Sequence, residues 1–582
     1  MPRLSLIFPY CLVILLIFQC YHRLNLATAV PVMACSLVIL CVAALAAFRQ
    51  IPERWVMRGA LAGSLAICGL YLLTCNEWVE ITGDNIAYIR DARRLVQGKE
   101  VLDSQYGLGV KTLLMPAVIL FPDSVPALKV TIAVSGFLFP FCTFLVFREF
   151  VDNYRALLMA LISGASWLAV RYSNVVTADM PFPAFSLLAL WSILQYIRRP
   201  GISWGWLIAA ACAVGWAYHV KSPSIYLVIA AAIYLTLRKE VKKPLLLAAF
   251  ASVWVLPWAI YLKVNFPESQ GYLGMVHQIA RGVYIPEGEA GSFWQNFLYY
   301  LFQKNPAGYL KNLEYFLLPV EYMKQLSITA KWRPFGWLVL ILIVIGYVFG
   351  RKPANRRPVS LLRSLEVHDW YFLGYVATLL ILPGSPDRYL LPVLPFIVFY
   401  IFKGVERICD RFPDSISPSK RSSRNRPRRN FLAVFQRRVW VRHSPVFLAC
   451  VFLLPSIFVD FATVRARRMT PGYGTYWKAY YEASVWMRDN TPPQSRVTTR
   501  KPGLVWFWSG RETSGYPRIE DPEEALRVLR KYDYVLLDNI PFFKEKLKYI
   551  IPAIKAYPKR FTVVHTTKAP KTYVIKINRN GP

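Results

Sequence analysis

The sequence predicts a polytopic α-helical membrane protein with about 13 transmembrane helices and a small C-terminal α/β domain outside the cytoplasm. Of its 582 residues, 55% are hydrophobic, and the mean hydropathy is +0.33. Apolar runs of about 17–25 residues recur along the chain, and each is long enough to cross a hydrocarbon core about 30 Å thick. Lys and Arg gather in the short loops between these apolar runs, as in membrane proteins. Residues 472–582 have no apolar run of that length.

The expected transmembrane spans begin near the amino terminus with an apolar run behind Arg3. This run resembles a signal peptide but has no small-x-small cleavage site, so we expect an uncleaved first span. In chain order, the expected spans are residues 4–20, 29–48, 58–75, 126–147, 155–171, 181–197, 204–219, 223–237, 244–263, 335–350, 369–384, 388–402 and 444–462.

The orientation follows from the distribution of basic residues. When the amino terminus is placed in the cytoplasm and the spans alternate, every basic cluster falls on the cytoplasmic side, as the positive-inside rule requires. The most basic loop, residues 403–442, contains KRSSRNRPRR and is expected to attract anionic lipid head groups. The net charge of +35 therefore indicates a membrane surface as partner rather than nucleic acid.

Two long loops and the tail then lie outside the cytoplasm. The loops are residues 76–125 and 266–333, and the second is aromatic enough to pack on the bundle as interfacial helices. The membrane region thus covers residues 1–463, and the extracytoplasmic α/β domain covers residues 472–582. In this domain we expect a helix at DPEEALRVLRKY and strands at LVWFWSG, YDYVLLD, FTVVHTT and TYVIKIN.

Four charged residues lie at or beyond the outer ends of the expected spans: Asp84, Asp179, Lys221 and Arg388. Three of them also have a structural interpretation. Asp84 could cap the amphipathic helix that follows it, Asp179 could pair with Arg171, and Lys221 could extend toward lipid phosphate. Outward-facing Lys and Arg are unexpected under the positive-inside rule, which favours a functional site.

This combination fits sugar transfer from a lipid phosphate. Displacing the sugar leaves a phosphate monoester with additional negative charge, which Lys and Arg would stabilise. A carboxylate within reach of the acceptor can take its proton, so one base and one assisted leaving group suffice for direct displacement with inversion. The ten cysteines show no CxxC or Cys/His spacing, and no Gly-rich phosphate loop is present.

Several motifs resemble those of the GT-C superfamily of membrane glycosyltransferases, especially the protein O-mannosyltransferase and lipid A aminoarabinose transferase branch. The motifs are GDNIAYIRDARRLVQG, TADMPFPAFSLLALW, HVKSPSIYLVIAA and RYLLPVLPF. Asn85 stands where many members have a second acid, Ser222 stands where they have Gly, and the usual paired prolines after the first outer loop are missing.

The resemblance implies a GT-C-like fold and transfer of a sugar from a polyprenyl-phosphate donor on the extracytoplasmic face, in a bacterial inner membrane. It implies Asp84 as general base, Asp179 as a supporting carboxylate, and Lys221 and Arg388 as ligands of the donor phosphate. Tyr88, Tyr389 and Asn85 are further candidates for substrate binding. No metal or other cofactor is expected, and the sugar and the acceptor (protein, lipid or glycan) stay open.

Two other functions are compatible with parts of this pattern. A transporter or flippase of a lipid-linked glycan would also carry charged residues in a helical bundle, but near the midplane rather than at one face. An inactive relative that only binds surface glycan or protein would not need all four charged positions.

Overall fold

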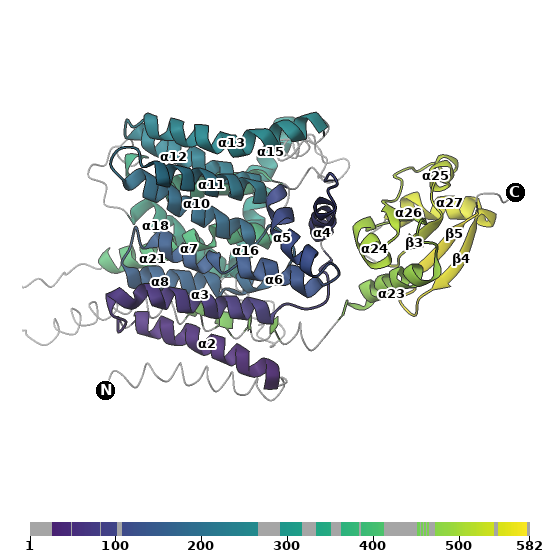
Figure 1. The fold of residues 1–582 in the computed structure, drawn as a ribbon, viewed down its shortest axis with the longest axis horizontal. Helices are drawn as coiled ribbons and strands as arrows, with labels where there is room; N and C mark the ends of the chain where they lie inside the picture. The colour runs from purple at the N-terminus through teal and green to yellow at the C-terminus, as the bar shows by residue number, and fades with distance from the viewer. Residues whose placement is uncertain are drawn as a thin grey trace, which may run out of the picture. The chain divides into compact units, whose positions relative to one another are not determined.

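The computed structural model shows a helical bundle and a separate mixed sheet (Figure 1). The residues it describes are 26–47, 49–81, 83–101, 107–265, 292–316, 333–350, 362–382, 386–411, 448, 451–453, 455–457, 459–460, 463–464, 472–540 and 545–578. The predicted span 4–20, most of 444–462 and the basic loop 412–442 lie outside these residues.

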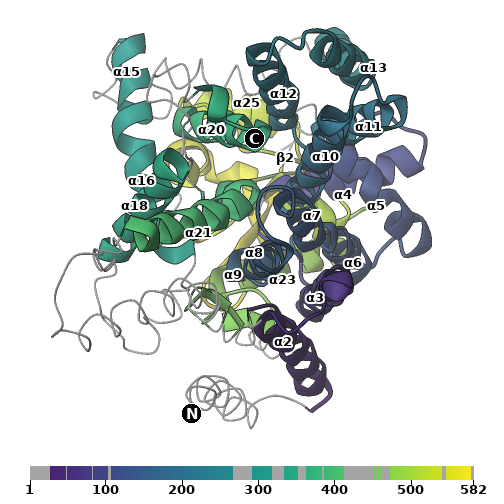
Figure 2. The same cartoon turned by 90° about the vertical axis from the view of Figure 1, so that its left-hand side faces the viewer.

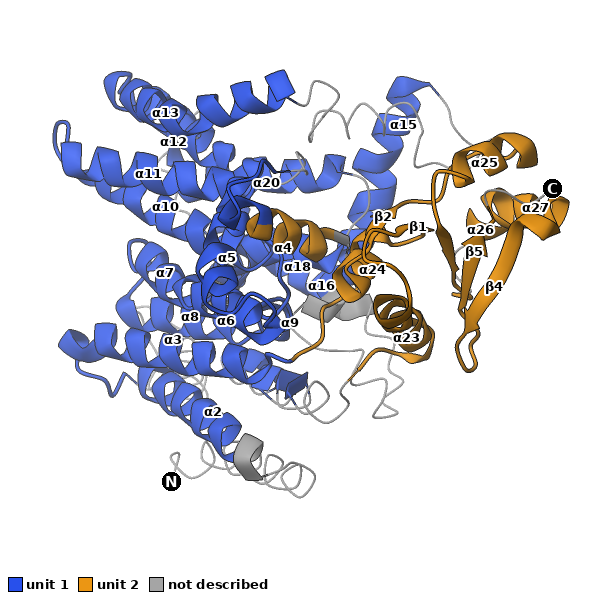
Figure 3. Cartoon of the chain, turned by 45° about the vertical axis from the view of Figure 1, so that its right-hand side comes forward, with its two compact units in different colours: residues 1–76, 94–469 blue, residues 77–93, 470–582 orange. Residues whose placement is uncertain are grey.

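The chain divides into two compact units (Figure 3). Unit 1 comprises residues 1–76 and 94–469, and unit 2 comprises residues 77–93 and 470–582. Unit 2 therefore combines the C-terminal domain with a short segment of the first outer loop. That segment includes Asp84.

Unit 1 is built from helices. The longer ones run side by side with roughly aligned axes, and a view turned by 90° shows them closer to end-on (Figures 1 and 2). The described elements of its first half are α2 (Leu26–Ala47), η1 (Glu53–Trp55), α3 (Val56–Leu73), α5 (Leu108–Leu120), α6 (Val125–Ser135), α7 (Leu138–Phe147), α8 (Asn153–Gly164), α9 (Trp167–Tyr172), α10 (Pro181–Arg198) and α11 (Trp204–Val220). Those of its second half are η2 (Ser222–Ser224), α12 (Ile225–Leu237), α13 (Lys242–Asn265), α15 (Phe293–Tyr299), η3 (Tyr300–Lys304), α16 (Asn305–Phe316), α18 (Arg333–Phe349), α20 (Val367–Ile381), η4 (Asp387–Val393) and α21 (Leu394–Arg411).

Five helical stretches of the described residues are long and apolar enough to cross a membrane: Val30–Ala47, Glu53–Leu73, Val125–Phe147, Lys242–Asn265 and Asp387–Ile408. Most expected spans within the described residues coincide with helices to within a few residues, but α21 continues to Arg411, nine residues beyond the expected end of span 388–402. The expected number of about 13 spans stays a prediction.

Two expected spans are each divided into two helices. Residues 126–147 form α6 and α7, which meet at Gly136, where an added Cβ would come within 3.0 Å of the Tyr71 ring. Residues 155–171 form α8 and α9, because the Ser166 side chain accepts from the Ala169 N–H and caps a new helix. Hydrophobic periodicity does not detect such breaks.

Glycines bring some helices into very close contact. A Cβ on Gly346 of α18 would lie 1.9 Å from the Tyr400 carbonyl oxygen of α21. A Cβ on Gly404 would in turn lie 2.3 Å from the Leu342 carbonyl oxygen. Small residues at such crossings allow backbones to approach, as is common between membrane helices.

Unit 2 contains a five-stranded sheet of order β2-β1-β3-β5-β4. The strands are β1 (Arg496–Thr499), β2 (Glu512–Ser514), β3 (Tyr534–Leu537), β4 (Phe561–Thr566) and β5 (Tyr573–Ile577). The helices are α4 (Gly83–Val96), α23 (Thr475–Asn490), α24 (Pro502–Ser509), α25 (Pro522–Leu529), α26 (Glu545–Tyr549), α27 (Ile551–Ala556) and the 3₁₀ helix η5 (Pro558–Arg560). Of α4, only residues 83–93 belong to unit 2. β1 pairs in parallel with β2 and β3, whereas β5 pairs antiparallel with β3 and β4.

Three of the four strands expected in the tail are present, as is the helix of DPEEALRVLRKY. The fourth prediction is wrong, because LVWFWSG lies in the helix α24 and its C-terminus. Pro502 stands in the first turn of that helix, and Gly510 ends it with φ 69°, so the local signals for a helix outweigh the strand propensity of the aromatic residues.

Candidate functional site

Asp179 lies in the turn between α9 and α10, where the chain reverses before Pro181 starts the next helix. Its carboxylate Oδ2 accepts a hydrogen bond from the Thr177 hydroxyl at 3.0 Å. Only 4% of the Asp179 side chain is exposed, so the carboxylate depends on neighbouring groups for its solvation.

Lys221 is the extended residue between α11 and η2, with φ −160° and ψ 126°. α11 ends here, and the 3₁₀ helix η2 begins at Ser222 with Pro223 in its first turn. Arg388 is the second residue of η4, the 3₁₀ segment that leads into α21. Both cations therefore project from breaks between helices.

The structure brings these three predicted site residues together. Lys221 Nζ lies 3.4 Å from Asp179 Oδ1, and Arg388 Nη1 lies 3.6 Å from Asp179 Oδ2. Tyr389 supports both cations, since its ring centroid is 4.6 Å from Lys221 Nζ and 5.4 Å from the Arg388 guanidinium carbon. One buried carboxylate thus meets two cations and an aromatic face.

A second ion pair adjoins the first. Arg171 Nη1 lies 3.0 Å from Asp387 Oδ2, and the Tyr172 hydroxyl donates to Asp387 Oδ1 at 2.7 Å. The sequence left open a pairing of Asp179 with Arg171. In the structure Arg171 forms an ion pair with Asp387, whereas Asp179 pairs with Lys221 and Arg388. Among the ion pairs of the described residues, three cations (Arg171, Lys221 and Arg388) thus lie against two carboxylates (Asp179 and Asp387).

Tyr309 of α16 is a residue that the sequence did not single out. Its side chain is 7% exposed, and its hydroxyl has no hydrogen-bond partner within the described part of the chain. Burial raises the pKa of Tyr309, and the nearby Tyr389 raises it further. The available signal was the aromatic composition of residues 266–333, which does not distinguish one tyrosine from another.

Asn305, at the start of α16, holds this helix against the end of α20. Its side-chain amide donates to the carbonyl oxygens of Leu380 and Leu382 at 2.8 and 2.7 Å. The π-helix η3 precedes Asn305 directly, and such wide turns are frequent near functional sites.

The other predicted site residues, Asp84, Asn85 and Tyr88, lie in unit 2 on α4. Asp84 is the second residue of the helix rather than the residue before it, so it is in the first turn and not at the N-cap. A carboxylate in the first turn still interacts favourably with the helix dipole. Asn85 is 1% exposed; its amide donates to the Glu80 carbonyl oxygen at 2.5 Å, and its side-chain oxygen accepts from the Ile86 N–H. Tyr88 is 4% exposed.

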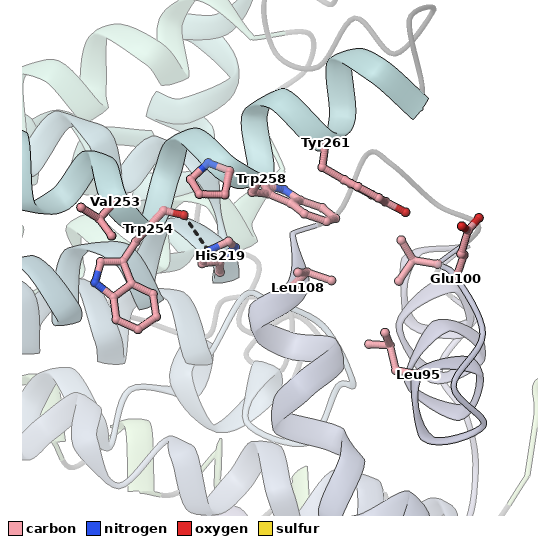
Figure 4. Close-up of a pocket in the computed structure, with 10 residues that line it drawn as sticks. Leu95, Glu100, Leu108, His219, Val253, Trp254, Trp258 and Tyr261 are labelled. Carbon is pink, nitrogen blue, oxygen red and sulfur yellow. Dashed lines mark hydrogen bonds between the residues drawn. The ribbon is translucent and has the colours of Figure 1, made fainter.

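A pocket of about 470 Å³ opens beside the last turn of α11, two residues before Lys221 (Figure 4). Its lining is mostly apolar and aromatic, and includes Leu108, Trp254, Trp258 and Tyr261. His219 Nε2 donates to the Trp254 carbonyl oxygen at 3.1 Å, which joins α11 to α13. In the part of the chain that the structure describes, no group of three or more His, Cys, Asp or Glu is arranged to hold a metal ion.

The fold and this site define a class: a helical membrane protein with charged side chains gathered where its helices break. A family model described as dolichyl-phosphate-mannose-protein mannosyltransferase matches residues 114–261. The matched segment contains Asp179 and Lys221 but neither Asp84 nor Arg388. No curated protein matches the chain by sequence.

The fold is similar to those of two solved glycosyltransferases. ArnT from Cupriavidus metallidurans bound to undecaprenyl phosphate has 14% identity and a TM-score of 0.54, over 91% of this chain and 100% of ArnT. The apo oligosaccharyltransferase of Archaeoglobus fulgidus has 12% identity and a TM-score of 0.51, over 90% of this chain and 75% of that one. The same enzyme tethered to an acceptor peptide containing the NVT sequon has 12% identity and a TM-score of 0.52, over 90% of this chain and 74% of that one.

The resemblance of the sequence to the GT-C superfamily of membrane glycosyltransferases is therefore confirmed at the level of the fold. Together with the five membrane-length helices, this fold makes the chain an integral membrane protein.

Proposed function

We propose that the chain is an inverting glycosyltransferase that moves a sugar from a polyprenyl-phosphate donor to an acceptor on the extracytoplasmic face. The observation that carries this proposal is the convergence of Lys221 and Arg388 on one buried carboxylate, Asp179, beside Tyr389. ArnT, which shares the fold, has been solved with undecaprenyl phosphate bound.

Lys221 and Arg388 would hold the donor phosphate. Arg offers a planar fork that matches two phosphate oxygens, and Lys contributes a compact point charge. Lys221 Nζ and Arg388 Nη1 lie 3.4 and 3.6 Å from the Asp179 carboxylate, which would hold both cations in place for a phosphate. As the bond between the sugar and the phosphate breaks, the growing charge on the phosphate is stabilised by both cations.

Asp84 would be the general base. The acceptor hydroxyl or amine attacks the anomeric carbon, its proton passes to the Asp84 carboxylate, and polyprenyl phosphate leaves on the opposite face of the sugar. Tyr88, Tyr389 and Tyr309 are proposed as polar contacts of the substrate. Asn85 would join them only by releasing the Glu80 carbonyl that it now binds.

The pocket between α11 and α13 would take the first isoprene units of the donor. It adjoins the turn that carries Lys221, so a phosphate on Lys221 and a tail in the pocket belong to one continuous ligand. Its aromatic walls include Trp258, which is 8% exposed, whereas Ile260 of α13, which does not line the pocket, is 60% exposed. A pocket of this size and apolarity suits part of a lipid chain.

The orientation belongs to the same proposal. The amino terminus lies in the cytoplasm, the C-terminal domain lies outside it, and a bacterial inner membrane is the expected location. The acceptor is a protein, lipid or glycan on the outer side. No metal is proposed, because the cations of the site supply the charge that a metal would supply.

The test uses the purified full chain in lipid nanodiscs with a panel of polyprenyl-phosphate sugars and of candidate acceptors. Release of polyprenyl phosphate is followed for the wild type, Asp84→Asn and Lys221→Ala. Turnover by the wild type, with loss of two or more orders of magnitude in both variants, is the expected result.

Equal turnover in all three proteins would remove Asp84 and Lys221 from the chemistry. Movement of a fluorescent lipid-linked glycan between leaflets of a proteoliposome, without release of polyprenyl phosphate, would replace the transferase with the flippase.

A further inference from the structure

The segment that carries Asp84 is structurally part of the C-terminal domain. Residues 77–93 group with residues 470–582 in unit 2, although nearly 380 residues of sequence separate them. The helix α4 continues to Val96, so its last three residues belong to unit 1.

Trp78 is the main contact at the start of this segment. Its ring meets Tyr473 and Tyr481 edge-on, with centroids 5.2 and 5.8 Å away. Both tyrosines also contact Trp508, at 5.0 and 5.4 Å, which closes an aromatic cluster that we call the Trp78 cluster: Trp78, Tyr473, Tyr481 and Trp508. Edge-to-face geometry at these distances is the favourable arrangement for aromatic rings.

The contacts continue along α4. Gly503 of α24 lies against Ile86, so that a Cβ at position 503 would come within 3.0 Å of Ile86 Cγ2. One turn of α24 further on, the Phe507 ring lies 5.5 Å from the guanidinium carbon of Arg93. Asp84 is therefore bracketed along the chain by Trp78 on one side and by Ile86 and Arg93 on the other, and all three contact the C-terminal domain.

We propose that the C-terminal domain is the positioning element of the general base, with Trp78, Trp508 and Gly503 as positioning residues for sugar transfer. This proposal rests on the function proposed above, because it takes Asp84 as the base. The domain acts through the place and order of α4 and touches neither donor nor acceptor in this role. Errors of about 1 Å in the position of a catalytic group can cost about 100-fold in rate, so a domain that fixes α4 affects turnover directly.

The first measurement is independent of activity. Amide hydrogen exchange of the full chain in nanodiscs is compared between wild type, Trp78→Ala and Trp508→Ala. Exchange of the amides in residues 84–93 should rise at least several-fold in both variants, whereas the amides of α10 should keep wild-type rates. Unchanged protection of residues 84–93 would overturn the proposal.

The second measurement separates positioning from general damage. Trp78→Ala and Gly503→Val should lower kcat by about 10- to 100-fold and leave the KM for the donor unchanged, because the cations that hold the phosphate are in unit 1. Trp78→Phe keeps an aromatic ring and should restore most of the loss. The matched control is Trp486→Ala, which removes a ring of the same domain that stacks on His565 at 4.6 Å and belongs to neither α4 nor the Trp78 cluster.

The outcomes distinguish this proposal from the proposed function. A wild-type protein without any sugar transfer would refute the transferase, while the exchange result would still decide whether the domain orders α4. Full kcat in Trp78→Ala, or an equal loss in Trp486→Ala, would refute the positioning role even if the transferase is correct.

Discussion

Asp179 shows how a single carboxylate can organise a site at a membrane boundary. It is 4% exposed, and an isolated charge at that burial would cost several kcal/mol. Lys221, Arg388 and the Thr177 hydroxyl offset that cost, and in return the carboxylate fixes two flexible cations. On the proposed function, an incoming phosphate would meet donors that are already placed, so less side-chain entropy would be lost on binding.

Arg388 should not be replaceable by Lys. Arg388→Lys keeps the charge but removes the planar fork, and a hydrogen bond to a charged group contributes about 1.5–3 kcal/mol. We expect kcat/KM for the lipid-phosphate donor to fall by roughly 10- to 100-fold. Steady-state release of polyprenyl phosphate measures this. Lys403→Ala is the control, since Lys403 pairs with Glu406 in α21, away from the site; a drop of the same size there would refute the assignment.

Tyr309 allows a prediction in which stability and activity change in opposite directions. Its buried hydroxyl has no partner among the described residues, and such a group costs about 1–3 kcal/mol. Tyr309→Phe should therefore keep or raise the thermal midpoint of the ligand-free protein while lowering kcat/KM by about 10-fold, because we propose that the hydroxyl contacts the substrate.

Tyr400→Phe provides the comparison for Tyr309→Phe. The Tyr400 hydroxyl donates to Asp369 at 2.6 Å, so this variant should lose stability. Thermal unfolding in nanodiscs, alongside the release assay, distinguishes the two variants. A destabilised Tyr309→Phe with full activity would contradict the role proposed for Tyr309.

At the scale of elements, the crossing of α5 and α11 fixes the Lys221 turn. A Cβ on Gly109 would lie 2.6 Å from the Val220 nitrogen, immediately before Lys221, and 2.8 Å from the His219 carbonyl carbon. These are backbone atoms that cannot rotate away. The N-terminus of α5 therefore needs glycine to lie against the end of α11.

We expect Gly109→Ala to separate these helices and to destabilise the protein by about 1–3 kcal/mol, as overpacking does. Donor binding should weaken as well, because Lys221 moves with the end of α11. The control is Gly205→Ala in the first turn of α11, where no atom lies within 4 Å of the added Cβ; a helical Gly→Ala change there should stabilise by about 0.5–1 kcal/mol. Equal effects of the two changes on the thermal midpoint would show that the crossing is not tight.

The helices themselves could be predicted because their signal is local. Residues 181–197 and 204–219 were expected as spans, and α10 and α11 run over Pro181–Arg198 and Trp204–Val220. The strands β1 and β2 were not predicted from the sequence, because they are only four and three residues long and lack an alternating pattern of apolar and polar residues. LVWFWSG was predicted as a strand because its residues favour strands. It is helical because Pro502 starts the helix α24 and Gly510 ends it.

The roles of the candidate site residues stay a prediction, and their pairing could not be predicted from the sequence. Breaks between spans locate Asp179, Lys221 and Arg388 from the sequence. The partner of Arg171 depends on how α9 meets η4, and 216 residues separate Arg171 from Asp387. The association of residues 77–93 with the C-terminal domain is likewise a long-range contact, which periodicity cannot report.

At the scale of the whole molecule, the charged residues of the candidate site lie at one set of helix ends, and basic residues lie at the opposite ends. α10 begins beside Asp179 and ends at Arg198, α12 begins after Lys221 and ends before Arg238, and η4 begins with Asp387 and Arg388. α11 runs the opposite way and ends at Lys221. At 1.5 Å per residue, the 18 residues of α10 extend about 27 Å, close to the thickness of a hydrocarbon core. The site and the basic loops are thus about one membrane thickness apart along the helices.

This separation predicts the orientation in the membrane. Arg238 and Lys239 follow α12, Lys242 and Lys243 begin α13, and the positive-inside rule predicts that such a basic connection lies in the cytoplasm. Alkaline phosphatase is active only outside the cytoplasm, so it should be active when fused after Pro582 and inactive when fused after Glu240. A fluorescent protein that folds only in the cytoplasm should give the reverse pattern. Phosphatase activity at Glu240 alone would place the site on the cytoplasmic side, where a lipid-phosphate sugar would have to be used before its transfer to the outer leaflet. Activity at Pro582 alone places Lys221 and Arg388 at the outer surface.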